Sequence, residues 1–258
     1  MDSNKSSITL GLIGFGNVGQ GVHSIVQTNQ GMIQDRLGQA VHIKTICVRN
    51  IDKYKGLANG AELTTDVNDI INDPDIDIVV EVIGGETPAY DYITEALKHK
   101  KYVVTANKEL IAKHKKTFFE LAKQNDVDIF FEASVGGGIP IIKSFKVGYS
   151  ANQIESVYGI LNGTTNFILT KLFENKQEFA TVLKEAQDLG FAESDPTADV
   201  SGLDAAYKIV ILTAVALKLN IQIDDVFYEG IDQIQLKDKQ LKINPTLREI
   251  KKFLIKMD

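Results

Sequence analysis

The residues of this chain whose types and spacing could do chemistry together lie in one segment, residues 190–208, with the sequence GFAESDPTADVSGLDAAYK. It holds four acids and one lysine. Asp195-Pro196 predicts a turn, and the apolar run Ile209–Leu217 predicts a helix that includes the end of the segment. Asp204 and Lys208 are then one helical turn apart on the same face, which brings a carboxylate and an ammonium together. An ordinary surface ion pair, which stabilises a helix by about 0.2–0.5 kcal/mol, is the alternative.

A glycine motif near the N-terminus predicts a nucleotide site. Residues Gly14-Phe15-Gly16-Asn17-Val18-Gly19 have the spacing G-x-G-x-x-G, with an apolar strand, Ser7–Ile13, before them and a helical pattern to Gln27 after them. In this setting the first glycine permits a tight turn, the second lets the backbone approach a pyrophosphate, and the third allows the helix to pack closely on the strand. The N–H groups and dipole of the helix N-terminus then hold the anion. A glycine-rich turn without a ligand is the alternative.

The composition limits the class of protein and its partners. The chain has 258 residues, 44% of them hydrophobic and 24% charged, which is typical of a soluble globular protein of one or two domains. A formal net charge of −6 and the lack of a basic patch argue against a nucleic-acid partner. The N-terminus has no signal-peptide core, and the longest apolar run, Ile209–Leu217, is too short to cross a membrane. We therefore expect a cytoplasmic protein. Cys47, the only cysteine, is expected to be a small core residue.

The first half of the chain alternates apolar strands with helices, which is typical of the α/β class with a doubly wound, Rossmann-type parallel sheet. The expected strands are Thr9–Ile13, Ile43–Val48, Ile78–Ile83, Tyr102–Thr105 and Val127–Phe131. The expected helices are Asn17–Gln27, Val67–Ile71, Pro88–Lys100 and Glu109–Asn125. Ligands of such sheets bind beyond the carboxyl ends of the strands. Besides the glycine motif, three segments fall there: 49–50, 84–88 and 105–108.

The pattern changes after Glu132, where Ser134–Pro140 forms a glycine-rich bridge. We expect a dinucleotide-binding domain at residues 1–135 and a second domain at residues 136–258, which carries the acid-rich segment. The second domain is expected to be α+β. Its expected elements are a strand at Ser156–Leu161, a turn at Asn162–Asn166 and helices at Phe167–Phe173, Glu178–Leu189 and Leu203–Leu219.

Together, these motifs resemble the homoserine dehydrogenase family. The matching pieces are the glycine motif, Ala106-Asn107-Lys108, residues 132–140 (EASVGGGIP), residues 161–166 (LNGTTN) and residues 190–208, in the family's order between residues 8 and about 235. The resemblance implies an enzyme that interconverts L-homoserine and L-aspartate 4-semialdehyde with a nicotinamide cofactor, on the route to threonine, methionine and isoleucine. It also implies a catalytic second domain through which subunits pair as a homodimer.

The resemblance assigns roles to particular residues. Hydride delivered to an aldehyde carbon leaves an alkoxide, which needs a cation or a proton donor beside it. By resemblance, Lys208 is the proton donor, and Asp204 shares the catalytic site with it. Glu193 and Asp204 match the acids that bind the substrate. Lys108 matches a catalytic lysine that contacts cofactor, substrate or both, with a solvated lysine at a helix start as the alternative.

The resemblance also implies a monovalent cation site, for an ion such as sodium. Its ligands would be Glu132 and the main-chain carbonyl groups of Val135, Gly137 and Ile139. Hard cations prefer oxygen ligands of this kind. A hinge loop is the other explanation of this glycine-rich segment, and both can hold together.

The cofactor is expected to be NADP, with NAD as the alternative. An NAD site usually has an acid at the end of the second strand, but Arg49 stands there, with Lys53 and Lys55 nearby. Cations at this place favour the 2′-phosphate of NADP, although Asp52 could serve NAD. The residues assigned to the cofactor are Gly14, Phe15, Gly16, Asn17, Val18, Gly19, Arg49, Lys108 and Gly190.

The C-terminal segment departs from the family. The family's chains continue well beyond the equivalent of Gln235, whereas here Lys237–Asp258 is a lysine-rich tail. We expect the second domain to be incomplete, and the chain to be less stable and less active than a longer version. This departure favours one alternative, a nucleotide-binding remnant of the same fold without turnover. A second alternative is a related dehydrogenase for another small amino or oxo acid, and the matches at Asn162–Asn166 and Gly190–Lys208 argue against it.

Overall fold

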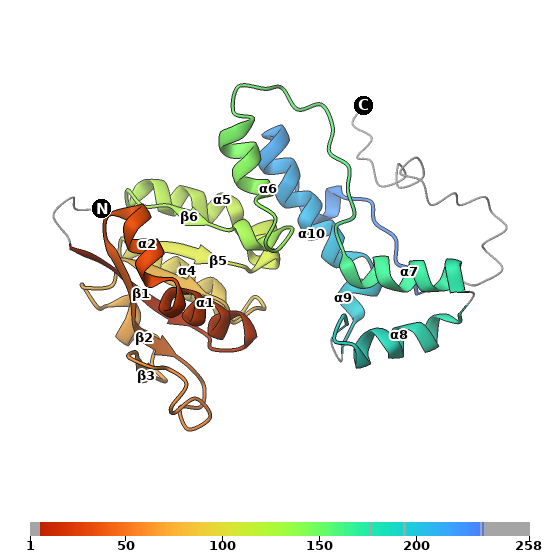
Figure 1. The fold of residues 1–258 in the computed structure, drawn as a ribbon. Helices are drawn as coiled ribbons and strands as arrows, with labels where there is room; N and C mark the ends of the chain where they lie inside the picture. The colour runs from red at the N-terminus through yellow and green to blue at the C-terminus, as the bar shows by residue number, and fades with distance from the viewer. Residues whose placement is uncertain (1–5, 176, 193–194, 233, 235–258) are drawn as a thin grey trace. The chain divides into compact units, whose positions relative to one another are not determined.

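The computed structural model of the chain describes residues 6–175, 177–192, 195–232 and 234 (Figure 1). The chain forms two compact units, Met1–Ile139 and Pro140–Asp258, called unit 1 and unit 2 below. The division falls at the end of the glycine-rich bridge, close to the boundary expected at residue 135.

Unit 1 contains, among its described residues, one six-stranded parallel sheet with the order β3-β2-β1-β4-β5-β6. The α/β class and the doubly wound parallel sheet predicted from the alternating pattern are confirmed. The central strands are near-continuous apolar runs because both faces of the sheet are covered. The strands are β1 (Ser7–Ile13), β2 (Ala40–Cys47), β3 (Glu62–Thr64), β4 (Ile78–Glu81), β5 (Tyr102–Thr105) and β6 (Ile129–Phe130).

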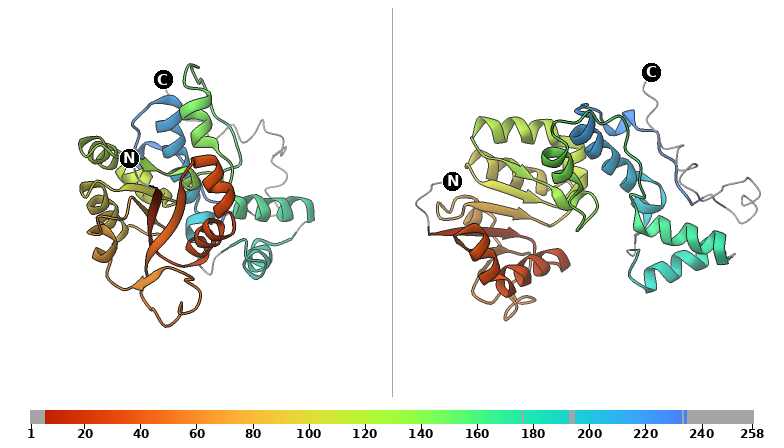
Figure 2. Two further views of the ribbon diagram at one scale, coloured as in Figure 1. Left: turned by 60° about the vertical axis from the view of Figure 1, so that its left-hand side comes forward. Right: turned by 45° about the horizontal axis from the view of Figure 1, so that its top comes forward.

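Helices cover both faces of this sheet. Figure 2 shows α1 and α2 against one face and α4 and α5 against the other. The core between them includes side chains that are fully buried, among them Leu12, Ile46 and Leu97. The helices of unit 1 are α1 (Asn17–Thr28), α2 (Gln30–Leu37), α3 (Asn68–Ile71), α4 (Ala89–Lys98), α5 (Lys108–Gln124) and the 3₁₀ turn η1 (Glu132–Ser134).

One α-helix and one strand of unit 1, α2 and β3, were not expected from the sequence. Helix α2 buries none of its residues, so it has no apolar periodicity that a sequence pattern could reveal. Strand β3 is three residues long at the edge of the sheet.

Cys47 is only partly buried, but burial raises the pKa of its thiol to about 11, so the thiol stays protonated near neutral pH.

Unit 2 is helical in its described part. Helices α7 and α8 lie side by side (Figures 1 and 2) and enclose a small core with Ile168, Leu172, Val182 and Ala186. Its helices are α6 (Ile141–Lys143), the π-helical turn η2 (Ser144–Gly148), α7 (Gly163–Asn175), α8 (Phe179–Asp188), α9 (Thr197–Val200), α10 (Leu203–Leu212), the π-helical turn η3 (Thr213–Leu217) and the 3₁₀ turn η4 (Ile223–Asp225).

The expected strand Ser156–Leu161 is not a strand in this structure. A strand is stabilised by pairing its backbone with a neighbour, and the described part of unit 2 contains no other strand with which it could pair. The expected turn Asn162–Asn166 is mostly the first turn of α7, which begins four residues earlier than predicted. None of the described helices combines the length and the apolar character that crossing a membrane requires.

Candidate active site

The glycine motif lies where β1 ends, and its three glycines differ in what surrounds them. Gly14 has a φ of +103°, and its N–H donates to the carbonyl oxygen of Cys47 at 3.0 Å. A methyl group at Gly14 would lie 3.0 Å from the carbonyl oxygen of Val82, and one at Gly19 would lie 2.3 Å from the carbonyl oxygen of Gly14. A methyl group at Gly16 would meet no atom within 4 Å. Packing therefore requires the first and third glycines, whereas the second borders open space that suits a phosphate.

The N-terminus of α1 is open to an anion. Gly16 is its N-cap, no side chain caps the first turn, and that turn contains no acid. Gly16, Asn17 and Val18 are exposed. Uncapped N–H groups at the start of a 12-residue helix form an anion site. The Phe15 side chain is buried and packs edge-on against the ring of His23, so only the Phe15 backbone can serve a ligand.

Arg49 stands two residues beyond β2, the strand next to β1. Its side chain is exposed and makes no ion pair or hydrogen bond with any described residue. Asp52, the acid that could serve NAD, is 2.5 Å from the Lys55 ammonium, but both side chains are well exposed and such pairs are weak. A guanidinium that has no partner in the described part of the chain suits a phosphate group at this place.

A buried carboxylate organises the carboxyl ends of β4 and β5. Glu81, the last residue of β4, is fully buried. Its Oε1 accepts the N–H groups of Ile83 (2.9 Å) and Gly84 (3.3 Å), and its Oε2 accepts the hydroxyl of Thr105 (2.6 Å). The hydrogen bonds tie the loop after β4 to the end of β5.

Asn107 continues this network into α5. Its N–H donates to the Thr105 hydroxyl oxygen (3.0 Å), its Nδ2 donates to the carbonyl of Gly85 (2.7 Å), and its Oδ1 accepts the N–H of Leu110 (3.2 Å). Asn107 is therefore the N-cap of α5, and Lys108 is the first residue of that helix. The predicted place of Lys108 at the carboxyl end of a strand is confirmed.

The residues expected to hold a cation lie in and after η1. Glu132 begins this turn, Val135 is buried and Ile139 is 65% exposed. Gly136 and Gly137 have φ values of +79° and +57°, a left-handed backbone that turns the loop sharply. Among the described residues, no group of three or more His, Cys, Asp or Glu side chains could hold a metal. One carboxylate with carbonyl oxygens is a donor set that fits a hard monovalent cation.

Unit 2 contains a cavity of about 630 Å³ where α7, α9 and α10 approach one another. Asp204 and Lys208 lie on its wall. The other lining residues are Asn162, Gly163, Thr164, Asn166, Phe167, Thr170, Lys171, Phe191 and Asp199.

The Asp204–Lys208 pair predicted from the helical spacing is present. Lys208 Nζ lies 2.7 Å from Asp204 Oδ2, and it also donates to the carbonyl oxygen of Leu161 at 2.7 Å. The Asp204 side chain is only 5% exposed and the Lys208 side chain 16%, so the pair differs from an ordinary surface ion pair, which was the alternative interpretation. An ammonium has three N–H donors, and the third has no partner among the described residues.

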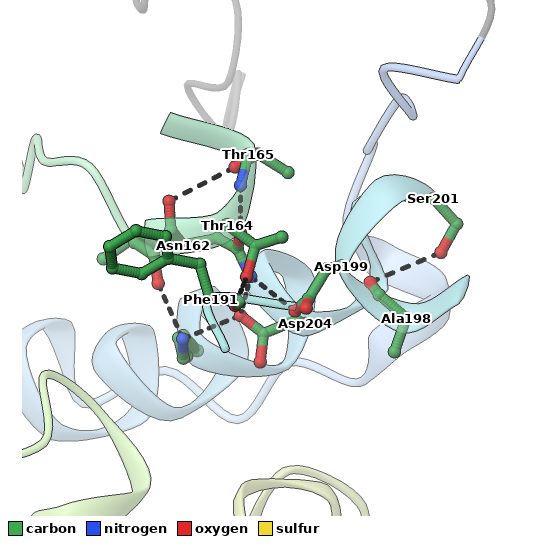
Figure 3. A network of polar contacts seen from close by, with 10 residues as sticks. Asn162, Thr164, Thr165, Phe191, Ala198, Asp199, Ser201 and Asp204 are labelled. Carbon is green, nitrogen blue, oxygen red and sulfur yellow. Dashed lines mark hydrogen bonds and ion pairs between the residues drawn. The ribbon is translucent and has the colours of Figure 1, made fainter. Parts of the chain in front are cut away.

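Asn162 joins this pair to a second acid, Asp199. Both residues lie in motifs named from the sequence, which assigned a role to neither. Asn162 Nδ2 donates to Asp204 Oδ2 (2.8 Å) and to Asp199 Oδ1 (2.7 Å), as Figure 3 shows. Asn162 is 37 residues from Asp199 and 42 from Asp204, so no local pattern could have revealed the contacts.

Two further predicted site residues belong to unit 2. Glu193 lies outside the described residues. Gly190 follows α8 with a φ of +77°, and its N–H donates to the carbonyl oxygen of Gln187 (3.0 Å). A glycine in this conformation is a common end to a helix, which accounts for Gly190 locally.

Comparison with known sequences shows which proteins this chain resembles. The profile described as "Homoserine dehydrogenase, NAD binding domain" matches residues 14–132, and the profile "Homoserine dehydrogenase" matches residues 140–255. The homoserine dehydrogenase of Bacillus subtilis (strain 168) is 48% identical over 233 residues, which are 90% of this chain and 54% of the relative. That of Synechocystis is 46% identical, over 90% of this chain and 53% of the relative. The chain thus spans about half the length of the curated relatives it matches.

Solved structures give the same result. A homoserine dehydrogenase from Thiobacillus denitrificans has 45% identity and a TM-score of 0.87, over 91% of this chain and 55% of that one. A putative homoserine dehydrogenase from Archaeoglobus fulgidus has 32% identity and a TM-score of 0.79, over 91% of this chain and 76% of that one. A hyperthermophilic archaeal homoserine dehydrogenase in complex with NADPH has 26% identity and a TM-score of 0.74, over 89% of this chain and 76% of that one.

Proposed function

Because the chain belongs to the homoserine dehydrogenase family, we propose that it interconverts L-homoserine and L-aspartate 4-semialdehyde, on the route to threonine, methionine and isoleucine. The observation that carries the proposal is the partly buried Asp204–Lys208 pair on the wall of the cavity in unit 2. A small amino acid with a reactive oxygen needs both a proton donor and acids for its ammonium, and this wall offers both.

Lys208 is the proposed proton donor. Its ammonium is oriented by Asp204 and by the carbonyl of Leu161, which leaves one N–H for the oxygen of a substrate. When the aldehyde is reduced, that oxygen takes a proton from Lys208 Nζ, and when the alcohol is oxidised the proton returns. The Asp204 carboxylate holds the Lys208 ammonium in place through a hydrogen bond of 2.7 Å.

The acids of the cavity suit the ammonium of the amino-acid substrate. Asp204 is already paired with Lys208, whereas no cation among the described residues pairs with Asp199. Asp199 therefore offers a negative charge to a ligand, and we assign substrate binding to it together with Asp204 and Glu193. Lys108 is assigned to the catalytic site and to the cofactor.

The cofactor is proposed to be NADP, with NAD as the alternative. When bound, it supplies or accepts the hydride at its nicotinamide ring. The backbone of residues 14–19 would hold the pyrophosphate, since Gly16 borders open space and the start of α1 is uncapped. Arg49 would bind the 2′-phosphate, because its guanidinium has no partner among the described residues. The NADPH complex of the archaeal relative supports the same choice. Gly190 is kept as a further cofactor contact.

A monovalent cation such as sodium is proposed at Glu132 and the carbonyl oxygens of Val135, Gly137 and Ile139. The donor set is one carboxylate with neutral oxygens, which suits a single positive charge. The cation would hold the loop after η1 in one conformation. We further propose that the protein works in the cytoplasm on a small-molecule substrate.

The test is the oxidation of L-homoserine by the purified chain, with NADP and with NAD, in the wild type and in Lys208→Met. Without its proton donor, the variant should lose about 10²–10⁴-fold in kcat while its dissociation constant for NADP stays nearly unchanged. Lys184→Met is the matched control, because Lys184 forms an exposed pair with Asp188 on α8 and does not line the cavity. Turnover of Lys208→Met near that of the control would remove Lys208 from the mechanism. NADP binding without any wild-type turnover would favour the non-catalytic remnant.

A further inference from the structure

Asn162 occupies a position from which one side chain contacts three separate elements of unit 2. It directly precedes α7, and its Oδ1 accepts the N–H of Thr165 at 2.7 Å. Its Nδ2 donates to Asp199 on α9 and to Asp204 on α10 (Figure 3). The residue is buried, and it lines the cavity with both acids.

The Asn162 side chain uses both of its N–H donors and its carbonyl oxygen in hydrogen bonds. A carboxamide has two N–H donors on one nitrogen and one carbonyl acceptor, and each N–H of Asn162 has a different carboxylate as its partner. The two carboxylates are therefore held within a hydrogen bond of the same atom. Like charges so close repel, and a buried neutral donor offsets that repulsion without neutralising either acid.

The two acids depend on Asn162 to different degrees. Asp204 Oδ2 accepts from both Asn162 and Lys208 (2.8 and 2.7 Å), so it keeps a partner if Asn162 is changed. Among the described side chains, Asn162 is the one that hydrogen-bonds Asp199. Asp199 is therefore the group whose position depends most on this amide.

We infer that Asn162 is a positioning residue that holds the carboxylates of Asp199 and Asp204 side by side on the cavity wall, where both face the ammonium of an amino-acid substrate. This inference rests on the proposed function for the identity of the substrate. Its consequence is selectivity: the site prefers a hydroxy or oxo compound that carries an ammonium over one that lacks it, because two acids share that charge.

Capping of α7 is the competing explanation of Asn162, and two substitutions separate the roles. Asp and Ser are both good N-caps, so Asn162→Asp and Asn162→Ser keep an acceptor for the N–H of Thr165. Neither can donate to two carboxylates: Asp has no donor when ionised, and Ser is too short and has a single hydroxyl. A residue that only caps the helix would tolerate both changes.

In kinetics, both variants should raise the KM for homoserine by about tenfold or more, with a much smaller change in kcat and an unchanged dissociation constant for NADP. The effect should disappear in the Asp199→Asn background, because Asn162 acts through Asp199: adding Asn162→Ser to Asp199→Asn should change KM less than twofold. Unchanged KM in both single variants, or full additivity in the double variant, would overturn the inference.

A measurement of thermal stability tests the inference without relying on enzyme activity. Asn162→Asp places three carboxylates together and should lower the melting temperature by several degrees. The exchange variant Asn162→Asp with Asp199→Asn puts a donor amide at position 199 facing an acceptor at 162, and should recover most of the loss. A melting temperature that stays low in the exchange variant would contradict the inference. If the wild type neither turns over nor binds homoserine, the proposed function fails, while this comparison still tests how Asn162 holds the two acids.

Discussion

At the scale of single residues, burial separates the Asp204–Lys208 pair from the Lys184–Asp188 pair of α8. The Asp204 and Lys208 side chains are 5% and 16% exposed, whereas Asp188 and Lys184, which have the same i,i+4 spacing, are 64% and 72% exposed. Water screens the second pair almost completely, but the first pair lies where the loss of one partner leaves a poorly solvated charge.

We therefore expect Asp204→Ala to lower the free energy of unfolding by about 3 kcal/mol, because it removes the buried carboxylate that balances the charge of the Lys208 ammonium and accepts a hydrogen bond from the Asn162 amide. Asp188→Ala should change it by less than about 0.5 kcal/mol. Urea unfolding monitored by circular dichroism measures both. Equal effects of the two substitutions would show that the cavity pair is as solvated as the surface pair.

Arg49 permits a prediction about cofactor choice. Removing its guanidinium should weaken NADP binding by about 1.5–3 kcal/mol, the value of a hydrogen bond to a charged group, and leave NAD binding nearly unchanged. Fluorescence titration of Arg49→Ala with each cofactor measures the difference. Arg36→Ala is the control, because Arg36 is an exposed arginine in the last turn of α2. Equal weakening of both cofactors would mean that Arg49 does not contact the 2′-phosphate.

At the scale of elements, two helices of unit 1 place candidate site residues at their first turns. Helix α1 begins uncapped after the glycine motif, and α5 begins at Lys108 with Asn107 as its cap. The second start is fixed by hydrogen bonds that lead through Thr105 to the buried carboxylate of Glu81. An uncapped start leaves N–H groups for a ligand, and a capped start holds a side chain in place.

The three glycines before α1 should therefore respond differently to the same substitution. Gly19→Ala should destabilise the fold, because its methyl group would lie 2.3 Å from the carbonyl oxygen of Gly14, a contact closer than atoms tolerate. Gly16→Ala should leave the melting temperature nearly unchanged, because its methyl group meets no atom within 4 Å, yet it should weaken NADP binding at least tenfold by filling the space beside the pyrophosphate.

Thermal unfolding and NADP titration of both variants check this contrast. If Gly16→Ala bound NADP as tightly as the wild type, the cofactor's phosphates would not approach the chain at residue 16. If Gly19→Ala were as stable as the wild type, α1 would be free to move away from β1.

At the scale of the whole molecule, the chain has two compact units, and each has its own core. The glycine motif and Arg49 belong to unit 1, and the cavity with Lys208 belongs to unit 2. A ligand stabilises the part of a protein that it binds by an amount set by its concentration relative to its dissociation constant.

NADP at a hundred times its dissociation constant should stabilise unit 1 by about 2.7 kcal/mol. Hydrogen exchange followed by mass spectrometry should show slower exchange in β1, α1 and β2, with little change in α7. The same experiment on Arg49→Ala, at the same NADP concentration, should show weaker protection. Equal protection of both units would show that they unfold as one cooperative body.

The sequence alone determined the features of this protein that depend on residues close together along the chain. Alternating apolar runs predicted the parallel sheet, the spacing of Gly14, Gly16 and Gly19 predicted the turn into α1, and the helical repeat predicted that Asp204 and Lys208 would meet. These features can be predicted from short segments, because the repeat of a helix or strand and the conformational freedom of glycine act over a few residues.

Only the tertiary structure decided which distant groups share an environment. The segment Ser156–Leu161 has the composition of a strand, but a strand forms only when its backbone pairs with another strand. The described part of unit 2 contains no such partner. The tertiary structure likewise brought Asn162 to Asp199 and Asp204, and Glu81 to Thr105, across separations of 24 to 42 residues. Such contacts follow from how helices and strands pack, and packing depends on the shape of the whole core, which no local spacing in the sequence records.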